Sequence, residues 1–364
     1  MFATKLYFMA RHKIIYISYS LSIDMSGAKK PGGVDAQFDE MVEGAKNALS
    51  TVLSLKKGED MLIVLDDSKH EIGLAFEKGA KVLGANTKIY SLSKHVRPIM
   101  EIPADLSEMF KDYTVIINTF STDSRETPFR VKLLYEQIQY QARVGHAPGI
   151  TTSMMREGPM KVDYSKIMEE ADRLMALFKG VERVHITAPA GTDITLELNK
   201  RLWQTDVKIK EGDFGNLPAG EVWCAPIEDG ANGVLVIDGS IGDLGNVPCP
   251  LTLRIKAGKL VSVECADKAF AKEVEELSNI DEMASTIGEL GIGLNPGARI
   301  VGIMLEDEKA SETSHIAFGN NLDMNGGRNG SKTHRDYLFY KPTIVATYSD
   351  GSTRTMLKDG KVVC

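Results

Sequence analysis

The chain has 364 residues, which is long enough for two domains with substantial cores. With 43% hydrophobic and 26% charged residues, its composition is ordinary for a soluble globular protein. A net charge of -7 gives no reason to expect a nucleic acid or an anionic membrane surface as a partner, so we predict neither.

Residues 1–30 are predicted to be an N-terminal extension. Basic residues precede a short apolar run at 14–23, which superficially resembles a signal peptide. The run contains two tyrosines and three serines, lacks a small-x-small cleavage site and is too short to span a bilayer. Because Met25 opens a polar stretch, the simpler interpretation is an extra segment before the true start.

The cysteines show no CxxC spacing, and they stand at Cys224, Cys249, Cys265 and Cys364. Such scattered cysteines suit a reducing compartment better than a disulfide framework, and they argue against a cysteine-based zinc site. No other stretch of the chain approaches a transmembrane span. We therefore predict a cytoplasmic protein.

Residues 31–180 are predicted to form an α/β domain with a mainly parallel sheet, because short apolar runs alternate with helical spacing. The predicted helices lie at 38–55, 72–83 and 128–144, and the predicted strands at 61–65, 88–92 and 114–120. No glycine-rich phosphate loop follows the first strand, where the chain continues with Asp66 and Asp67. We therefore do not predict nucleotide binding.

After a helical pattern at 164–178, the apolar residues change from helical spacing to alternation with polar residues. The predicted domain boundary therefore falls near residue 180. Residues 181–364 are predicted to form an α+β metal-binding domain rich in antiparallel sheet. The hairpin signals are alternating apolar residues around short turns, at 184–198, 221–241 and 251–263 and in two Asp-Gly turns near the C-terminus.

Two of the seven histidines have neighbours that suit metal binding. His334 precedes Asp336 by two residues, so on a strand both side chains would point to one face and offer an imidazole and a carboxylate to one cation. The same spacing also fits a surface pair. The other five stand alone and are predicted to be surface or core residues: His12, His70, His95, His146 and His185.

His315 follows an acidic cluster at 306–312, and glycine-dense sequence joins it to His334. Glu289 and Glu221 each stand beside a glycine-rich turn. Taken singly, each glutamate is more often a solvated loop residue. Together with Asp336, however, these residues make the ligand inventory of a hydrolytic two-metal site. The spacing alone does not show that they converge.

The sequence resembles the thermophilic metallo-aminopeptidase family typified by aminopeptidases T and S. The resemblance rests on five segments in order: Gly191-Thr-Asp193, 216–226, 288–296, 307–319 and 329–336. It implies a two-domain homodimer with two divalent cations, zinc, cobalt or manganese, that releases N-terminal residues from peptide substrates. The matching ligands are Glu221, Glu289, His315, His334 and Asp336, with a bridging glutamate and catalytic roles for Glu221 and Glu289.

The sequence departs from the family at one catalytic position. The family commonly has a tyrosine seven residues after the first histidine, where this chain has Leu322, although Tyr337 and Tyr340 stand nearby in sequence. Ala219-Gly220-Glu221 also replaces the family's usual Thr-Glu-Glu. Both differences are compatible with metal binding. They remove side chains that the resemblance links to peptidase turnover.

Two other functions stay open. The 2,5-dihydroxypyridine dioxygenases resemble distant relatives of these peptidases, and His315, His334 and Asp336 would supply their single ferrous ion with a facial triad. A non-catalytic metal-binding dimer is the third reading. Retention of both glutamates favours two cations, and retention of the whole ligand set argues against a decayed site.

Overall fold

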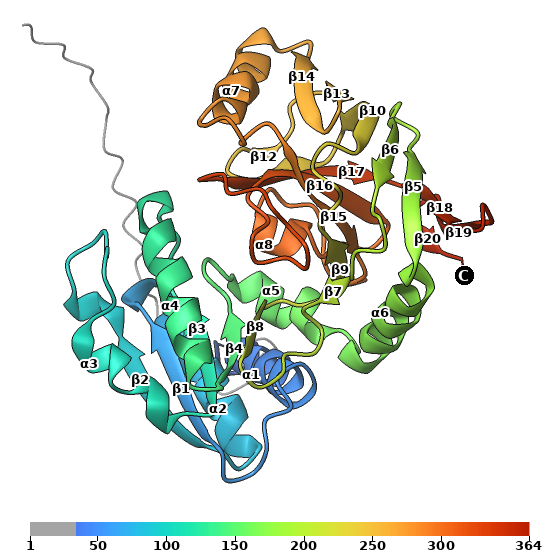
Figure 1. The fold of residues 1–364 in the computed structure, drawn as a ribbon. Coiled ribbons are helices and arrows are strands. Elements are labelled where there is room, and N and C mark those ends of the chain that lie inside the picture. Colours follow the sequence, from blue (N-terminus) through green and yellow to red (C-terminus); the bar gives the residue numbers. More distant parts are fainter. Residues whose placement is uncertain (1–33, 364) are drawn as a thin grey trace, which may run out of the picture.

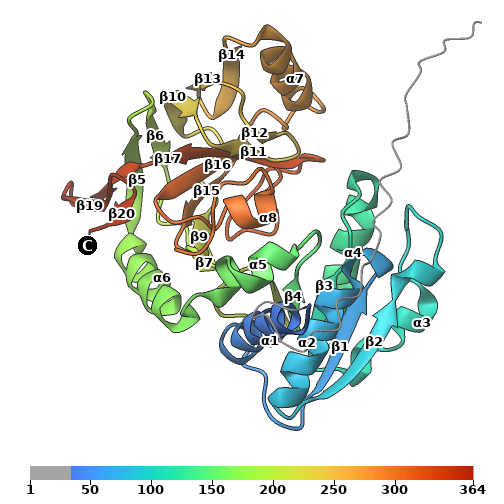
Figure 2. The same ribbon diagram turned by 180° about the vertical axis from the view of Figure 1, so that it is seen from behind.

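The computed structural model describes residues 34–363. The predicted extension at 1–30, with His12, and Cys364 lie outside the described residues. Figure 1 shows a blue-to-green N-terminal half beside a yellow-to-red C-terminal half, and Figure 2 shows the same arrangement from behind. Within the described part, no helix is long and apolar enough to cross a membrane.

The N-terminal half contains a parallel sheet with the strand order β2-β1-β3-β4-β8, which confirms the predicted α/β class. Its strands are β1 (Asp60–Leu65), β2 (Asn86–Ser91), β3 (Val115–Thr119), β4 (Arg143–His146) and β8 (Asp213–Asn216). Strand β1 is apolar after its first residue because both faces of the sheet are covered. Met61 and Ile63 pack in one core, whereas Leu62 and Val64 pack in a second core.

Helices cover both faces of this sheet. Core residues of α1 (Val34–Thr51) and α2 (His70–Val82) share the cluster of Met61 and Ile63. Those of α3 (Ala104–Ser107) and α4 (Thr127–Gln139) share the cluster of Leu62 and Val64. Short 3-10 helices lie at η1 (Asp67–Lys69), η2 (Leu92–Lys94), η3 (Phe110–Asp112), η4 (Ser124–Glu126) and η5 (Pro159–Lys161).

The helix predicted over 128–144 is too long. Helix α4 ends at Gln139, and β4 begins at Arg143. Between them Gln141 has a φ of 63°, a left-handed conformation that stops the helix. Ala142 and Val144 are buried and continue the apolar spacing beyond the helix, so the spacing alone did not separate the two elements.

Two antiparallel-rich sheets form the C-terminal half, as predicted. One has the order β14-β13-β10-β6-β5-β18-β19-β20, and its strands are β5 (Val181–Thr187), β6 (Asp193–Glu197), β10 (Ala231–Ile237), β13 (Leu251–Lys256), β14 (Lys259–Glu264), β18 (Thr343–Tyr348), β19 (Thr353–Lys358) and β20 (Lys361–Val362). The remaining helices are α5 (Thr152–Arg156), α6 (Tyr164–Phe178), α7 (Lys268–Ser278) and α8 (Met304–Asp307).

The other sheet, which we call the site sheet, has the order β12-β11-β17-β16-β15-β9-β7. Its strands are β7 (Gln204–Thr205), β9 (Glu221–Cys224), β11 (Ser240–Ile241), β12 (Gly245–Asn246), β15 (Ile287–Gly293), β16 (Thr313–Gly319) and β17 (His334–Tyr340). The boundary predicted near residue 180 stays a prediction, because the chain returns at β8 to the parallel sheet before it enters β9.

The hairpin predicted over 221–241 is wrong. Strand β9 pairs with β7 and β15 in the site sheet, whereas β10 pairs with β6 and β13 in the other sheet. The segment between them is held elsewhere, since Ile227 donates its backbone N–H to Glu197 at 2.8 Å. The alternating pattern came from two strands with buried faces in different sheets. The hairpins predicted over 184–198 and 251–263 are confirmed as β5–β6 and β13–β14.

Cys249 and Cys265 form a disulfide, so the expectation of free thiols is wrong for these two residues. They flank the β13–β14 hairpin, in which Thr252 pairs with Glu264, and this pairing brings their Cα atoms to 6.8 Å. Their separation of 16 residues matches no short motif, so only the hairpin register shows their proximity. Cys224 is a buried free cysteine.

Candidate metal centre

The site sheet brings together all five residues that the sequence singled out. Glu221 lies on β9, Glu289 on β15, His315 on β16, and both His334 and Asp336 on β17. The strand register pairs Glu289 with Ala317 and Ala317 with Asp336. Cross-strand partners share a face, and residues two apart on one strand share a face as well, so the five side chains gather on one side of the sheet.

Small residues on this face leave room for the cluster. Gly291 lies directly opposite His315, and a Cβ atom at Gly291 would stand 1.9 Å from His315 Nε2. Ala317 separates Glu289 from Asp336 with only a methyl group. The Glu-x-Gly-x-Gly spacing of β15 therefore places one ligand-type side chain and two empty positions on the same face.

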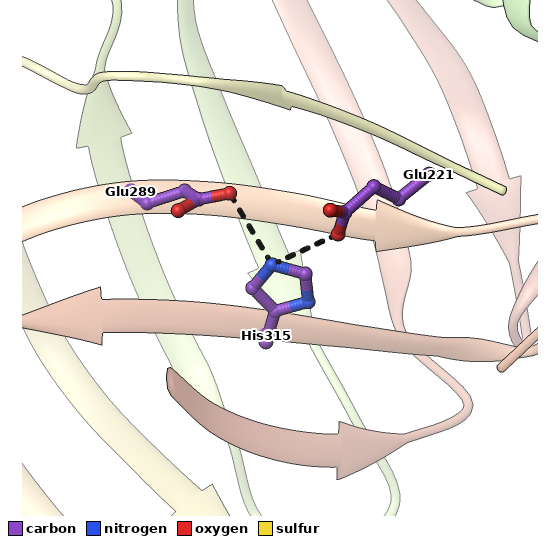
Figure 3. A group of neighbouring side chains, drawn as sticks. All are labelled: Glu221, Glu289 and His315. Carbon is purple, nitrogen blue, oxygen red and sulfur yellow. Dashed lines mark hydrogen bonds and ion pairs between the residues drawn. The ribbon is translucent and has the colours of Figure 1, made fainter. Parts of the chain in front are cut away.

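Glu289 lies at the centre of the cluster. Its Oε1 is 3.3 Å from His315 Nε2, and its Oε2 is 3.0 Å from His334 Nε2. His315 Nε2 is also 3.5 Å from Glu221 Oε2, and Figure 3 shows both carboxylates pointing toward this imidazole. His334 Nε2 is 3.2 Å from Asp336 Oδ1.

These contacts define two potential ligand groups, each with its atoms within 4.8 Å of one another. Group 1 is Glu221, Glu289 and His315, and group 2 is Glu289, His334 and Asp336. Glu289 belongs to both. A carboxylate in this position has one oxygen for each group, which is the geometry of a bridging ligand.

The orientation of the side chains suits cation binding. His334 Nδ1 donates to the backbone carbonyl oxygen of Asn320 at 2.7 Å, which fixes the tautomer and leaves Nε2 free for a metal ion. Glu221 Oε2 is buried and accepts no hydrogen bond from the residues that the structure describes. A buried carboxylate oxygen without a donor is costly unless a cation occupies the site.

Charge interactions shift the pKa values within the cluster. Burial alone would raise the pKa of Glu289, but hydrogen bonds with His315 and His334 outweigh it and lower the pKa to about 2. Burial would lower the pKa of His315, yet the Glu289 hydrogen bond and the charges of Asp336 and Glu221 raise it to about 9. These shifts favour the charged forms of Glu289 and His315, whereas burial raises the pKa of Glu221 well above its ordinary value.

Metal affinity is expected to rise with pH. A cation binds the neutral imidazole, and His315 releases its proton only near pH 9, so protons compete with the metal below that value. Each proton displaced makes the apparent affinity rise about tenfold per pH unit. Titration of metal-free protein with Mn²⁺ at pH 6, 7 and 8 measures this slope. An affinity that stays flat over this range contradicts the assignment of His315.

A buried lysine, which sequence reasoning missed, lies beside group 1. Lys309 is fully buried and forms ion pairs with Glu221, with Glu308 at 2.7 Å and with Asp206 at 3.0 Å. Burial would lower the pKa of Lys309, but the charges of Asp206, Glu221 and Glu308 raise it well above its ordinary value. The one sign of this buried lysine in the sequence is its place directly after an acidic run. Such a pattern more often belongs to a solvated loop.

The cluster opens into a cavity of about 560 Å³. One wall comes from the site sheet and its loops, and the opposite wall comes from α4 and β8 of the N-terminal half. The α4 wall is largely apolar and includes Val131, Leu134 and Tyr135. The sequence pattern of α4 did not indicate that this helix lines a cavity, because the cavity forms only where the two halves of the chain meet.

Leu322, which the sequence resemblance matches to the family's tyrosine, lies on the cavity wall and is 60% exposed. Tyr337 does not replace it, since its ring is buried edge-on against Phe318 at 5.3 Å between centroids. Tyr340 lies outside the cavity lining, and Tyr135 is the tyrosine among the described lining residues.

Histidines predicted to lie outside the site have other partners. His185 pairs with Asp193 at 2.7 Å on the surface, and His95 contacts the Tyr90 hydroxyl at 2.9 Å. His146 is buried in the N-terminal half beside Phe120, and burial lowers its pKa to about 3.

Comparison with known proteins gives a family match, one curated relative and two solved structures with a similar fold. The family model described as thermophilic metalloprotease (M29) matches residues 150–362. Aminopeptidase AmpS of Bacillus subtilis (strain 168) is 26% identical over 195 residues, which are 47% of this chain and 47% of that protein. The match thus spans about half the length of that relative.

Two solved structures share the fold over most of the chain. The 2,5-dihydroxypyridine dioxygenase of Pseudomonas putida KT2440 has a TM-score of 0.71 and 16% identity, and the alignment covers 90% of this chain and 98% of that one. Wild-type AmpT of Thermus thermophilus has a TM-score of 0.65 and 17% identity, with coverage of 90% and 99%. At these identities the likeness establishes the fold, which is common to both proteins.

Proposed function

Because the chain belongs to the thermophilic metalloprotease (M29) family, we propose that it is a metallo-aminopeptidase, a hydrolase that releases N-terminal residues from peptides. The observation that carries this proposal is the shared position of Glu289. Its two carboxylate oxygens lie 3.3 Å and 3.0 Å from two different imidazoles, so it belongs to both ligand groups. The named relative, an aminopeptidase, supports the same activity.

Two divalent cations, zinc, cobalt or manganese, fit the two groups. Glu221 and His315 would hold one, His334 and Asp336 would hold the other, and Glu289 would bridge them. Such a pair lowers the pKa of a bound water and polarises the scissile carbonyl. Oxygen and imidazole ligands suit these metals.

The chain's own residues supply position and surroundings. The Asn320 carbonyl orients His334, and Lys309 holds one oxygen of Glu221. The apolar wall formed by Val131 and Leu134 offers a surface for a substrate side chain. With Leu322 at the family's tyrosine position, that position provides no phenol to a developing oxyanion.

The dioxygenase alternative uses the same residues differently. A single ferrous ion would need His315, His334 and Asp336 around one point. In the structure each imidazole instead groups with Glu289 separately, and only His334 groups with Asp336. This arrangement favours two cations over one. A homodimer and peptide partners remain part of the proposal, on the strength of the family resemblance. Cytoplasmic location also remains a proposal, without the support of free thiols at Cys249 and Cys265.

Removal of metal is expected to abolish peptidase activity reversibly. Dialysis against a chelator should eliminate hydrolysis of aminoacyl p-nitroanilides, and cobalt, zinc or manganese should restore it with two ions per chain by elemental analysis. An N-acetylated substrate is the control, since an aminopeptidase requires the free amine. One tightly held iron per chain, with dioxygen uptake on dihydroxylated rings, would instead establish the oxygenase.

A further inference from the structure

Glu221 is held more firmly than its role as one ligand among five requires. Its backbone N–H and that of Gly220 both donate to Asp206 Oδ1, at 3.2 Å and 2.9 Å. Its backbone carbonyl accepts a hydrogen bond from Thr205 Oγ1 at 2.6 Å. Gly220 has a φ of 138°, and a Cβ atom there would stand 2.6 Å from Asn295. The backbone at Glu221 therefore has little freedom.

The side chain of Glu221 is held as well. Lys309 donates to Glu221 Oε1, which leaves Oε2 as the oxygen that faces His315 Nε2 at 3.5 Å. Lys309 itself is fixed by Asp206 at 3.0 Å and Glu308 at 2.7 Å, and its side chain is fully buried. Asp206 thus acts on Glu221 twice, through the backbone and through the lysine.

We propose that Lys309 and Asp206 are positioning residues that force Glu221 to offer a single oxygen to the cation of group 1. A free carboxylate rotates and can present both oxygens, whereas this one has its second oxygen bound to a buried ammonium. Apart from Glu221, the partners of Lys309 are Asp206 and Glu308, and neither belongs to group 2. Among the described residues, the ion pairs of the lysine therefore reach a ligand of group 1 and none of group 2.

This inference rests on the proposed two-cation function and predicts an unequal effect of mutation. Lys309→Met should keep the length of the side chain but release Glu221 Oε1, so that the carboxylate turns and group 1 loses its geometry. We expect Mn²⁺ affinity at one position to fall about 10- to 100-fold, the range found for residues that orient metal ligands. The other position should keep its affinity within about twofold, because among the described residues His334 and Asp336 form no hydrogen bond or ion pair with this lysine.

The experiment is Mn²⁺ titration followed by elemental analysis and electron paramagnetic resonance. Wild-type protein should hold two exchange-coupled ions, and Lys309→Met should hold one and give a mononuclear signal. Lys272→Met is the matched control, since Lys272 is exposed on α7 and pairs only with Glu276 in the described part of the chain. A general loss of structure would weaken both positions together.

Asp206→Asn provides a second variant if Lys309→Met does not fold. Its amide oxygen still accepts from the backbone of Gly220 and Glu221, but the ion pair with Lys309 is lost. Selective loss of about tenfold in affinity at one position supports the proposal. Two ions bound with wild-type affinity in the variant that folds would overturn it. Fewer than two ions in the wild type would overturn the two-cation function itself.

Discussion

Glu289→Gln is expected to lower peptidase turnover by roughly 100-fold or more while the protein stays folded. The substitution keeps the shape of the side chain but replaces one carboxylate oxygen with an NH₂ group, which cannot ligate a cation. Because Glu289 belongs to both ligand groups, the loss affects the link between the two cations rather than one of them. Some metal binding should survive through the remaining members of each group.

The measurement pairs metal stoichiometry with kcat and KM for an aminoacyl p-nitroanilide. Glu273→Gln, at an exposed position of α7, is the matched control and should behave as wild type. Burial and two hydrogen bonds to imidazoles distinguish Glu289 from that surface residue. Unchanged turnover with two bound ions in Glu289→Gln would contradict the bridging role.

Gly291→Ala is expected to disable the site through a single methyl group. The new Cβ atom would stand 1.9 Å from His315 Nε2, so the imidazole must leave its position between Glu221 and Glu289. Strand β15 is fully buried and paired on both sides, and it has little room to yield. We expect a destabilisation of about 1–3 kcal/mol, typical of overpacking, and loss of the group 1 cation.

Thermal unfolding and Mn²⁺ titration together test this prediction. Gly330→Ala is the control, because a Cβ atom there would meet Leu322 at an ordinary 3.7 Å. If Gly291→Ala keeps both cations and full activity, His315 has moved without consequence and is no ligand.

A local rule in the sequence indicated one pair of ligand-type residues, since His334 and Asp336 share a face by the period of a strand. Glu289 was expected beside a glycine-rich turn, and it lies instead within the buried strand β15. Their convergence could not be predicted in this way. It depends on the antiparallel order β17-β16-β15-β9, which unites positions more than a hundred residues apart. The family resemblance, rather than spacing, supplied that step.

The parts that the sequence did not indicate depend on contacts between distant segments. In the sequence, Lys309 is a charged residue that directly follows an acidic run, which gives no sign of burial. Only the fold encloses it among three carboxylates. In the sequence, Tyr135 is one residue of a predicted helix. It lines the cavity because α4 lies opposite the site sheet in the fold. The hairpin over 221–241 was predicted wrongly for the same reason. An alternating pattern indicates that one face of a strand is buried, but it does not show which strand pairs with it.

Strand β8 limits how this protein can be divided. It ends at Asn216 within the parallel sheet, and Glu221 begins the next strand only five residues later. A cut near residue 180 would leave β8 on the C-terminal fragment and expose the hydrogen-bonding edge of β4 on the N-terminal fragment. The N-terminal fragment would also carry away the α4 wall of the cavity. The two halves are therefore not independent modules at that point, because a strand of one sheet and a wall of the cavity would both be separated from their partners.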